Sequence, residues 1–237
     1  MRIRNISAAV VAAVLALPGC SSGSSTATAD VLATSATGAV GRTSAAPEAS
    51  ATNATPQDPT SDRSLAKHIL SGGDLEGFTM SGDIEFQDPA SFATEHKQPL
   101  SEVEESGLLA AAFASFGGTA EGTEATSVAT LYATDDEATA EAQRLFTSNS
   151  EAEEGVTARL VDVPTIPGAK AVELKGDDDG EESIAVEVVF VTGAILHEIF
   201  VFGPADAIHV DLVIAAARAL FDRLSTAETP PASRLPG

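Results

Sequence analysis

The chain has 237 residues, with 35 acidic and 13 basic side chains and a formal net charge of −22 at pH 7. So acidic a surface repels polyanions, and we expect no nucleic-acid partner. The sequence holds a single cysteine, which excludes a disulfide within the chain and zinc sites built from several thiolates.

The first 19 residues have the pattern of an export signal. Arg2 and Arg4 form a basic head, and the segment from Ile6 to Leu17 is apolar except for one serine. As a helix this segment spans roughly 18 Å, well short of the roughly 30 Å hydrocarbon core of a bilayer. We therefore expect the segment to be cleaved and not retained as a membrane-spanning helix.

The apolar segment ends on Leu17-Pro18-Gly19-Cys20, and Cys20 is the only cysteine. These residues resemble the lipobox of bacterial lipoproteins, which has leucine three positions before the cysteine and a small residue directly before it. Pro18 departs from the Ala, Ser, Thr or Val that is usual there. The resemblance implies that Cys20 is acylated by a diacylglyceryl transferase and becomes the first mature residue after signal cleavage.

Two or more acyl chains, such as a diacylglyceryl group and palmitate, hold a protein stably on a membrane. The predicted location is therefore the extracytoplasmic side of the cell membrane, with the lipid on Cys20 as the anchor. The alternative is an ordinary secretory signal in which the cysteine occurs by chance.

Residues 20–63 consist mainly of Ser, Thr, Ala, Gly and Pro and show no apolar periodicity. Such a composition cannot bury enough apolar surface to offset the entropy of ordering, so we predict a flexible, disordered linker. A single folded domain is expected over residues 64–224, which is long enough for one core. Residues 225–237 are expected to be a disordered tail.

The first half of the domain predicts three short helices, an extended segment and two strands. Asp88-Pro89 has the pattern of a helix N-cap followed by proline, and Gly107–Phe116 indicates a buried strand or, alternatively, a short helix. The predicted elements are a short helix at 64–70, an extended segment within 75–86, helices at 89–96 and after 99, and strands at 107–116 and 126–132.

The second half predicts two helices and four strands. Thr134 and Glu137 form a capping box that starts a helix, and Thr192-Gly193 separates two apolar runs as the turn of a hairpin. The predicted elements are a helix from 135 to 146–148, strands at 156–163, 169–174, 183–191 and 194–202, and a final helix that starts at Pro204 or Asp206 and ends at 224.

Strands linked by hairpins and followed by helices predict an α+β fold, with an antiparallel sheet and helices packed on one face. The order of elements also resembles a broad set of lipid-anchored envelope proteins from high-GC Gram-positive bacteria. Most of that set lack an assigned activity, so the resemblance implies a location and a fold more than a function.

Catalytic and metal-binding signatures are sparse. No two of His68, His96, His197 and His209 have a metal-ligand spacing, and the chain lacks the nucleophile-elbow, phosphate-loop and dinucleotide motifs. The acidic run 177–182 does not fit a calcium loop either, and we interpret it as a solvated turn. We therefore predict no enzyme activity, no cofactor and no metal.

The last hairpin holds the only candidate binding residues. A turn at Thr192-Gly193 places Glu187 opposite Glu198, on a face that also carries Phe200 and Phe202. Paired carboxylates in an apolar patch can form the floor of a ligand site. The alternative is a half-covered face whose glutamates point to solvent. His197, on the other face, is interpreted as a hydrogen-bonded core histidine.

The predicted function is that of a lipid-anchored extracytoplasmic binding or interaction module of the cell envelope. Its partners would be the membrane, through Cys20, and an envelope protein. One alternative is a carrier or sensor of a small apolar ligand or lipid that contacts the hairpin face. A second alternative is an envelope hydrolase without a recognisable signature.

Overall fold

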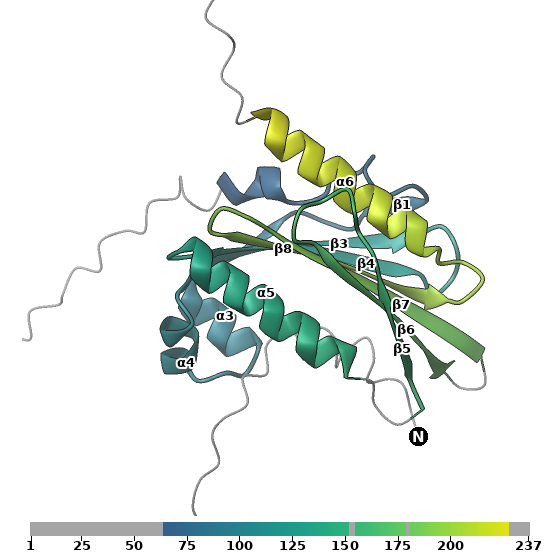
Figure 1. The fold of residues 1–237 in the computed structure, drawn as a ribbon, viewed down its shortest axis with the longest axis horizontal. Coiled ribbons are helices and arrows are strands. Elements are labelled where there is room, and N and C mark those ends of the chain that lie inside the picture. The colour runs from purple at the N-terminus through teal and green to yellow at the C-terminus, as the bar shows by residue number, and fades with distance from the viewer. Residues whose placement is uncertain (1–63, 152–154, 179–180, 228–237) are drawn as a thin grey trace, which may run out of the picture. The chain divides into compact units, whose positions relative to one another are not determined.

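The computed structural model describes residues 64–151, 155–178 and 181–227, which form an α+β domain (Figure 1). The predicted signal, Cys20, the predicted linker and residues 228–237 of the predicted tail lie outside the described residues. Within the described ranges, no helix combines the length and the apolar character that crossing a bilayer requires.

An antiparallel sheet forms the middle layer. Its strands follow the order β1-β3-β4-β8-β7-β6-β5, and β2 also pairs with β3. The eight strands found in the described residues are β1 Phe78–Met80, β2 Glu85–Gln87, β3 Leu108–Gly118, β4 Glu124–Tyr132, β5 Thr157–Val161, β6 Lys170–Asp178, β7 Glu181–Thr192 and β8 Ile195–Pro204.

Helices cover both faces of this sheet (Figure 1). The 3-10 turn η1 (Ala66–His68) and α6 (Val210–Ala227) lie on one face, and α3 (Pro89–Glu95), α4 (Leu100–Glu105) and α5 (Asp135–Ser150) lie on the other. The expected class, an α+β domain on an antiparallel sheet, is confirmed. The helices were expected on one face, but the central strands β7 and β8 are buried on both faces and both need cover.

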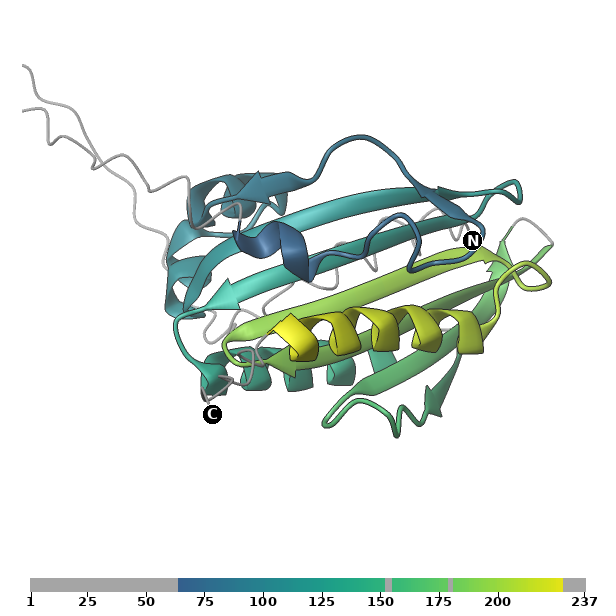
Figure 2. The same cartoon turned by 90° about the horizontal axis from the view of Figure 1, so that it is seen from above.

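The larger core lies under α6, which runs along β7 and β8 (Figure 2). The buried stripe of α6 repeats every three or four residues, as an amphipathic helix requires. It consists of Val213, Ala216, Ala217, Leu220 and Leu224, and it packs on alternate residues of the strands, among them Val186, Val188, Phe190, Ile199 and Val201.

The final helix begins later than the sequence predicts. Gly203 and Pro204 still pair with Ile184 and Ser183, so the chain stays in the sheet to the end of β8. The N–H of Ala205 then donates to the carbonyl of Glu182 at 3.0 Å, which holds the turn that precedes α6.

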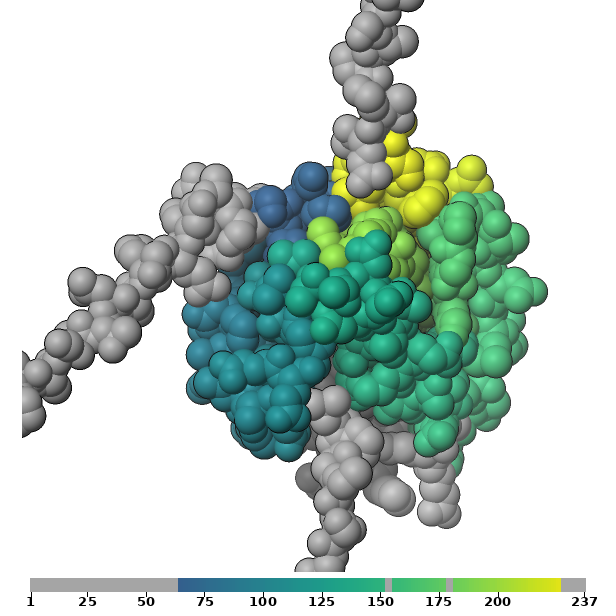
Figure 3. All heavy atoms as spheres, turned by 60° about the vertical axis from the view of Figure 1, so that its left-hand side comes forward, coloured from purple at the N-terminus to yellow at the C-terminus, as the bar shows by residue number. Residues whose placement is uncertain are grey.

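The segment that contains η1 is attached to α6 by a charged contact. Arg223 of α6 donates to the carbonyl of Ile69 at 2.7 Å and forms an ion pair with Asp74. Leu65, Ile69 and Leu70 are buried in the same core. Figure 3 shows the result on the surface, where this segment in blue adjoins the end of α6 in yellow.

The start of α5 confirms Thr134 as the N-cap, while the carboxylate of Glu137 bonds to the Thr134 hydroxyl and not to an amide as predicted. The hydroxyl of Thr134 accepts from the N–H of Glu137 at 3.2 Å and donates to its carboxylate at 2.9 Å. The first of these bonds satisfies a backbone donor that the first turn of a helix leaves without an intrahelical partner, and the second orients the hydroxyl that accepts it.

The β7–β8 hairpin differs from the prediction by its turn. Thr192 pairs with Ile195, so the turn consists of Gly193 and Ala194, with a positive φ of 56° at Gly193. Glycine favours that conformation at the first position of a two-residue hairpin turn. Every cross-strand pair is shifted by two residues from the predicted register, and a shift of two leaves the membership of both faces unchanged.

Candidate functional site

Two glutamates lie next to each other beneath α5. Glu187 on β7 pairs with Phe200 and Glu198 on β8 pairs with Val189, so the two carboxyl groups are diagonal neighbours and not directly opposed as predicted. Their side chains are hydrogen-bonded to each other. Glu187 is 2% exposed and Glu198 is 4% exposed. The alternative in which these glutamates point to solvent is therefore wrong.

Asn149, in the last turn of α5, holds one of the two carboxylates. Its amide Nδ2 donates to both oxygens of Glu187, at 2.8 and 2.9 Å. Asn149 is itself buried. The helix and the sheet are thus joined by a polar contact inside an otherwise apolar layer.

Burial changes the protonation of the acid pair. It raises the pKa of Glu187 to about 7, while the hydrogen bonds from Asn149 and Glu198 act in the opposite direction by stabilising the carboxylate. Burial also raises the pKa of Glu198 well above its ordinary value, and the adjacent Glu187 carboxylate raises it further. Glu198 therefore keeps its proton and donates it to Glu187, which ionises first.

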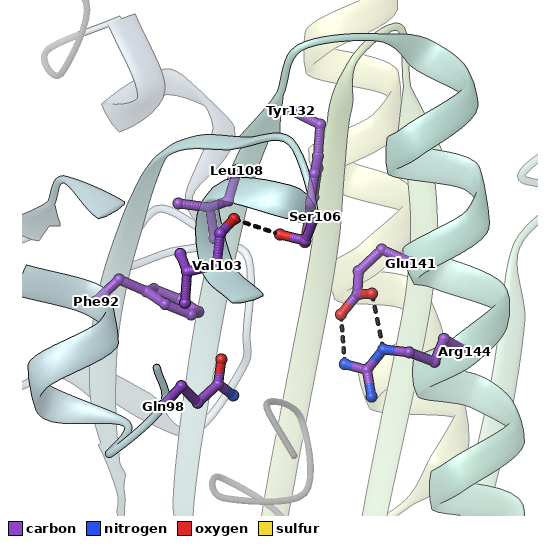
Figure 4. A pocket seen from close by; sticks show the side chains of 8 residues that line it. All are labelled: Phe92, Gln98, Val103, Ser106, Leu108, Tyr132, Glu141 and Arg144. Carbon is purple, nitrogen blue, oxygen red and sulfur yellow. Dashed lines mark hydrogen bonds and ion pairs between the residues drawn. The ribbon is translucent and has the colours of Figure 1, made fainter. Parts of the chain in front are cut away.

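A second polar group on α5 faces the α3–α4 segment. Arg144 and Glu141 form a two-pronged ion pair, with Nε–Oε2 and Nη2–Oε1 distances of 2.8 and 2.5 Å. Figure 4 shows both side chains pointing from α5 across the strands toward α3 and α4. They line a small crevice with a cavity volume of about 10 Å³, which is room for one water molecule. The other residues that line it are Phe92, Gln98, Val103, Ser106, Leu108 and Tyr132.

Tyr132 connects the crevice to the acid pair. It lies on β4 and is 4% exposed, and its pKa is raised first by burial and then by the charges of Glu141 and Glu198. We call this set the polar seam, a row of polar side chains between α5 and the sheet that consists of Tyr132, Glu141, Arg144, Asn149, Glu187 and Glu198.

The two predicted aromatic residues of the site lie beside the acid pair, under the C-terminal half of α5. Phe200 is buried and Phe202 is half-buried, and both belong to a cluster with Phe146 of α5 and the strand residues Val172, Leu174 and Ala185. The structure thus brings all four predicted site residues, Glu187, Glu198, Phe200 and Phe202, to one face of the sheet. Their role in binding a ligand stays a prediction.

The contribution of α5 to the site was not predicted from the sequence. Asn149 follows Leu145 by four residues and Ala138 by eleven, so it lies on the buried stripe of the helix. A polar residue on an apolar stripe was the available signal for a buried partner on the sheet. Tyr132, Glu141 and Arg144 carried no comparable signal, since their contacts depend on how α5 crosses the sheet.

His197, on the opposite face, is the hydrogen-bonded core histidine that the sequence predicts. Its Nε2 lies 2.8 Å from the hydroxyl of Thr192 and its Nδ1 lies 3.4 Å from the carbonyl of His68, and its ring stacks on Phe190 at 4.5 Å. Burial lowers the pKa of His197 to about 3 and that of His68 to about 4, so both rings are neutral near pH 7.

In the part of the chain that the structure describes, no three His, Cys, Asp or Glu side chains come together in a group that could hold a metal ion. Asp177, Glu181 and Glu182, at the adjoining ends of β6 and β7, are exposed to solvent.

The architecture that these contacts define is one antiparallel sheet with helical layers on both sides. No known protein-family model matches the chain, and no curated protein is similar to it in sequence. Among solved structures, the chain is similar to the extracellular domain of PknH from Mycobacterium tuberculosis, with a TM-score of 0.50 and 10% identity. The match covers 69% of this chain and 96% of that chain, and at this identity it concerns the fold alone.

Proposed function

We propose that this chain is a lipoprotein of the cell envelope, anchored by acyl groups on Cys20, and that its domain is an extracytoplasmic binding or interaction module. The observation that carries the proposal is the likeness to the extracellular domain of PknH, which extends over 96% of that chain. A fold that serves elsewhere as an extracellular domain supports an extracytoplasmic location here. The export signal with its single cysteine supports the anchor.

The arrangement of the polar groups supports binding in preference to catalysis. Glu187 is held by Asn149 and Glu198, Arg144 contacts Glu141, and His197 contacts Thr192. A general acid or base must reach a substrate, and these groups are oriented toward one another. We therefore propose a role in which the domain presents a surface or a site without performing a reaction.

A second candidate function is that of a carrier or sensor of a small apolar ligand or lipid. The observation that favours it is the position of Phe200 and Phe202 beside the buried acid pair, beneath α5. Mass spectrometry of an organic extract of the natively purified protein separates the two functions. A bound lipid in stoichiometric amount supports the carrier, whereas a discrete envelope protein cross-linked in intact cells supports the interaction module.

Substituting Cys20→Ala tests the anchor. We expect the variant to lose the acyl groups and to leave the membrane fraction, or to accumulate with its signal uncleaved, because the thioether that carries the lipid cannot form. Fractionation of cells and the intact mass of the protein measure both effects.

The matched control for the anchor is Ser21→Ala, which changes the next residue and keeps the cysteine. This variant should fractionate as the unaltered protein does. A Cys20→Ala variant that is processed normally and stays in the membrane fraction would contradict the lipoprotein proposal.

A further inference from the structure

Two helices cover opposite faces of the central strands, but they are held by different contacts. The buried stripe of α6 includes Val213, Leu220 and Leu224. The buried side chains of α5 are Ala138, Leu145 and Asn149. The C-terminal half of α5 therefore rests on the sheet through Leu145, the half-buried ring of Phe146 and the amide of Asn149.

The part of the sheet beneath the C-terminal half of α5 encloses two carboxyl groups. Glu187 and Glu198 are almost completely buried and hydrogen-bonded to each other. If both carboxyl groups were ionised in this buried position, the two charges would repel each other and neither would be hydrated. That state is far more costly than one in which the pair carries a single charge. While a proton remains between them, one carboxylate accepts from both Asn149 and Glu198.

Among the described residues, the cationic groups near the pair have partners of their own. Glu141 and Arg144 of α5 form an ion pair with each other, and Tyr132 of β4 is a buried, neutral phenol. Lys170 of β6 contacts Gln143, and its ammonium lies 5.0 Å from the ring centre of Phe146 on the same helix. Loss of the shared proton therefore leaves the polar seam more negative.

We propose that the C-terminal half of α5 is a proton-dependent lid, closed while Glu187 and Glu198 share a proton and released from the sheet when that proton is lost. Release exposes the face that carries the acid pair and Phe200. The lid concerns the folded domain alone and does not rest on the lipid anchor or on the proposed binding role.

The direction of the effect follows from proton binding. In the closed state the pair holds protons above pH 4.5, the ordinary pKa of a glutamate: Glu187 keeps its proton up to about pH 7, and Glu198 keeps the shared proton beyond that. In the open state both groups are solvated and ionise near pH 4.5. The opening constant should therefore rise with pH, by up to about tenfold per pH unit for each proton released.

Amide hydrogen exchange of the full-length protein in detergent, at pH values from 5 to 8 and corrected for the intrinsic rate, tests the lid. We expect the protection of residues 143–150 to fall as the pH rises from 5 to 6.5, while that of residues 213–224 in α6, which follows the global stability, stays constant over this interval. In Glu198→Gln the amide still donates to Glu187 but cannot lose a proton. One proton fewer is then released on opening, so the rise of the opening constant with pH should be smaller by up to about tenfold per pH unit.

A second pair of variants adds a negative charge to the last turn of α5, once at a buried position and once at an exposed one. Asn149→Asp places a carboxylate against Glu187 and should lower the protection of residues 143–150 by about tenfold or more at pH 7, since it removes hydrogen bonds to a charged group. Ser148→Asp adds the same charge at an exposed position and should leave the protection unchanged.

Three results would overturn the proposal. One is protection of residues 143–150 that does not vary with pH, and another is a Glu198→Gln variant with the pH dependence of the unaltered protein. The third is a parallel loss of protection in α6, which would mean that the whole domain unfolds and that α5 does not move by itself.

Discussion

Replacing Phe200 with serine is expected to lower the free energy of unfolding by about 3–5 kcal/mol, the usual cost of truncating a buried phenylalanine. Phe200 is 6% exposed and packs with Val172, Leu174 and Ala185. A domain of this kind has a total stability of only about 5–15 kcal/mol, so the variant should be close to unfolding. Thermal and urea unfolding followed by circular dichroism measure the loss.

Two other phenylalanines serve as controls for this substitution. Phe202→Ser should cost less, because Phe202 is only half-buried at the edge of the same cluster. Phe86→Ser, on β2, should cost least, because Phe86 is 37% exposed. If Phe200→Ser left the stability unchanged and abolished co-purification of a lipid, Phe200 would line a ligand site and the carrier function would hold.

The sequence predicts the long strands well, because they are runs of apolar and β-branched residues. The face of β7 and β8 that packs under α6 is predicted correctly for the same reason, since side chains alternate along a strand and even a register shift of two preserves the faces. The register itself depends on which two residues form the turn. Thr192-Gly193 and Gly193-Ala194 both place a glycine in the turn, and the sequence does not separate them.

The burial of Glu187 and Glu198 could not be predicted from the hairpin alone. A strand that alternates apolar and acidic residues is typical of a sheet face open to solvent. Here Val189, Leu196 and Phe200 make that face apolar around the glutamates, and α5 covers it. The cover comes from a helix about 40 residues earlier in the chain, so only the tertiary arrangement decides that the carboxyl groups are enclosed.

The position of α6 illustrates a different limit. Pro204 and Asp206 are common residues at helix starts, and the local pattern therefore favours a start there. In the structure, β8 continues to Pro204 because its last residues pair with Ser183 and Ile184. Pairing between strands thus overrides the local preference and moves the start of the helix to Val210.

The free energy of unfolding is expected to fall both in acid and in alkali, and the two losses have separate origins. Burial depresses the pKa of His68 to about 4 and that of His197 to about 3, so the unfolded chain binds more protons than the fold below pH 6.5, the ordinary pKa of histidine. Stability from this source is complete above pH 6.5. It falls as the pH drops from 6.5 toward 3, by up to about 1.4 kcal/mol per pH unit for each histidine.

The acid pair acts in the opposite sense. The pKa of Glu187 is raised to about 7 and that of Glu198 is raised well above its ordinary value, so above pH 4.5 the fold holds protons that the unfolded chain has lost. Stability from this source is complete below pH 4.5 and falls as the pH rises through 7. Between pH 4.5 and 6.5 the two effects oppose each other, and the free energy of unfolding should be nearly constant.

Single substitutions should remove one side of the profile at a time. His197→Gln keeps a side chain that can hydrogen-bond Thr192 but does not titrate, so the loss of stability in acid should be shallower and the alkaline side unchanged. Glu198→Gln should make the alkaline side shallower and leave the acid side unchanged. Urea midpoints measured from pH 3 to 9 give both slopes.

The two effects should be independent because adjacent strand residues point to opposite faces. His197 lies in the core under α6, and Glu198 lies beneath α5. The double variant should therefore show the sum of the two single changes. If either single variant altered both sides of the profile, the faces would be coupled through β8, and the lid on one face could not open without disturbing the core on the other.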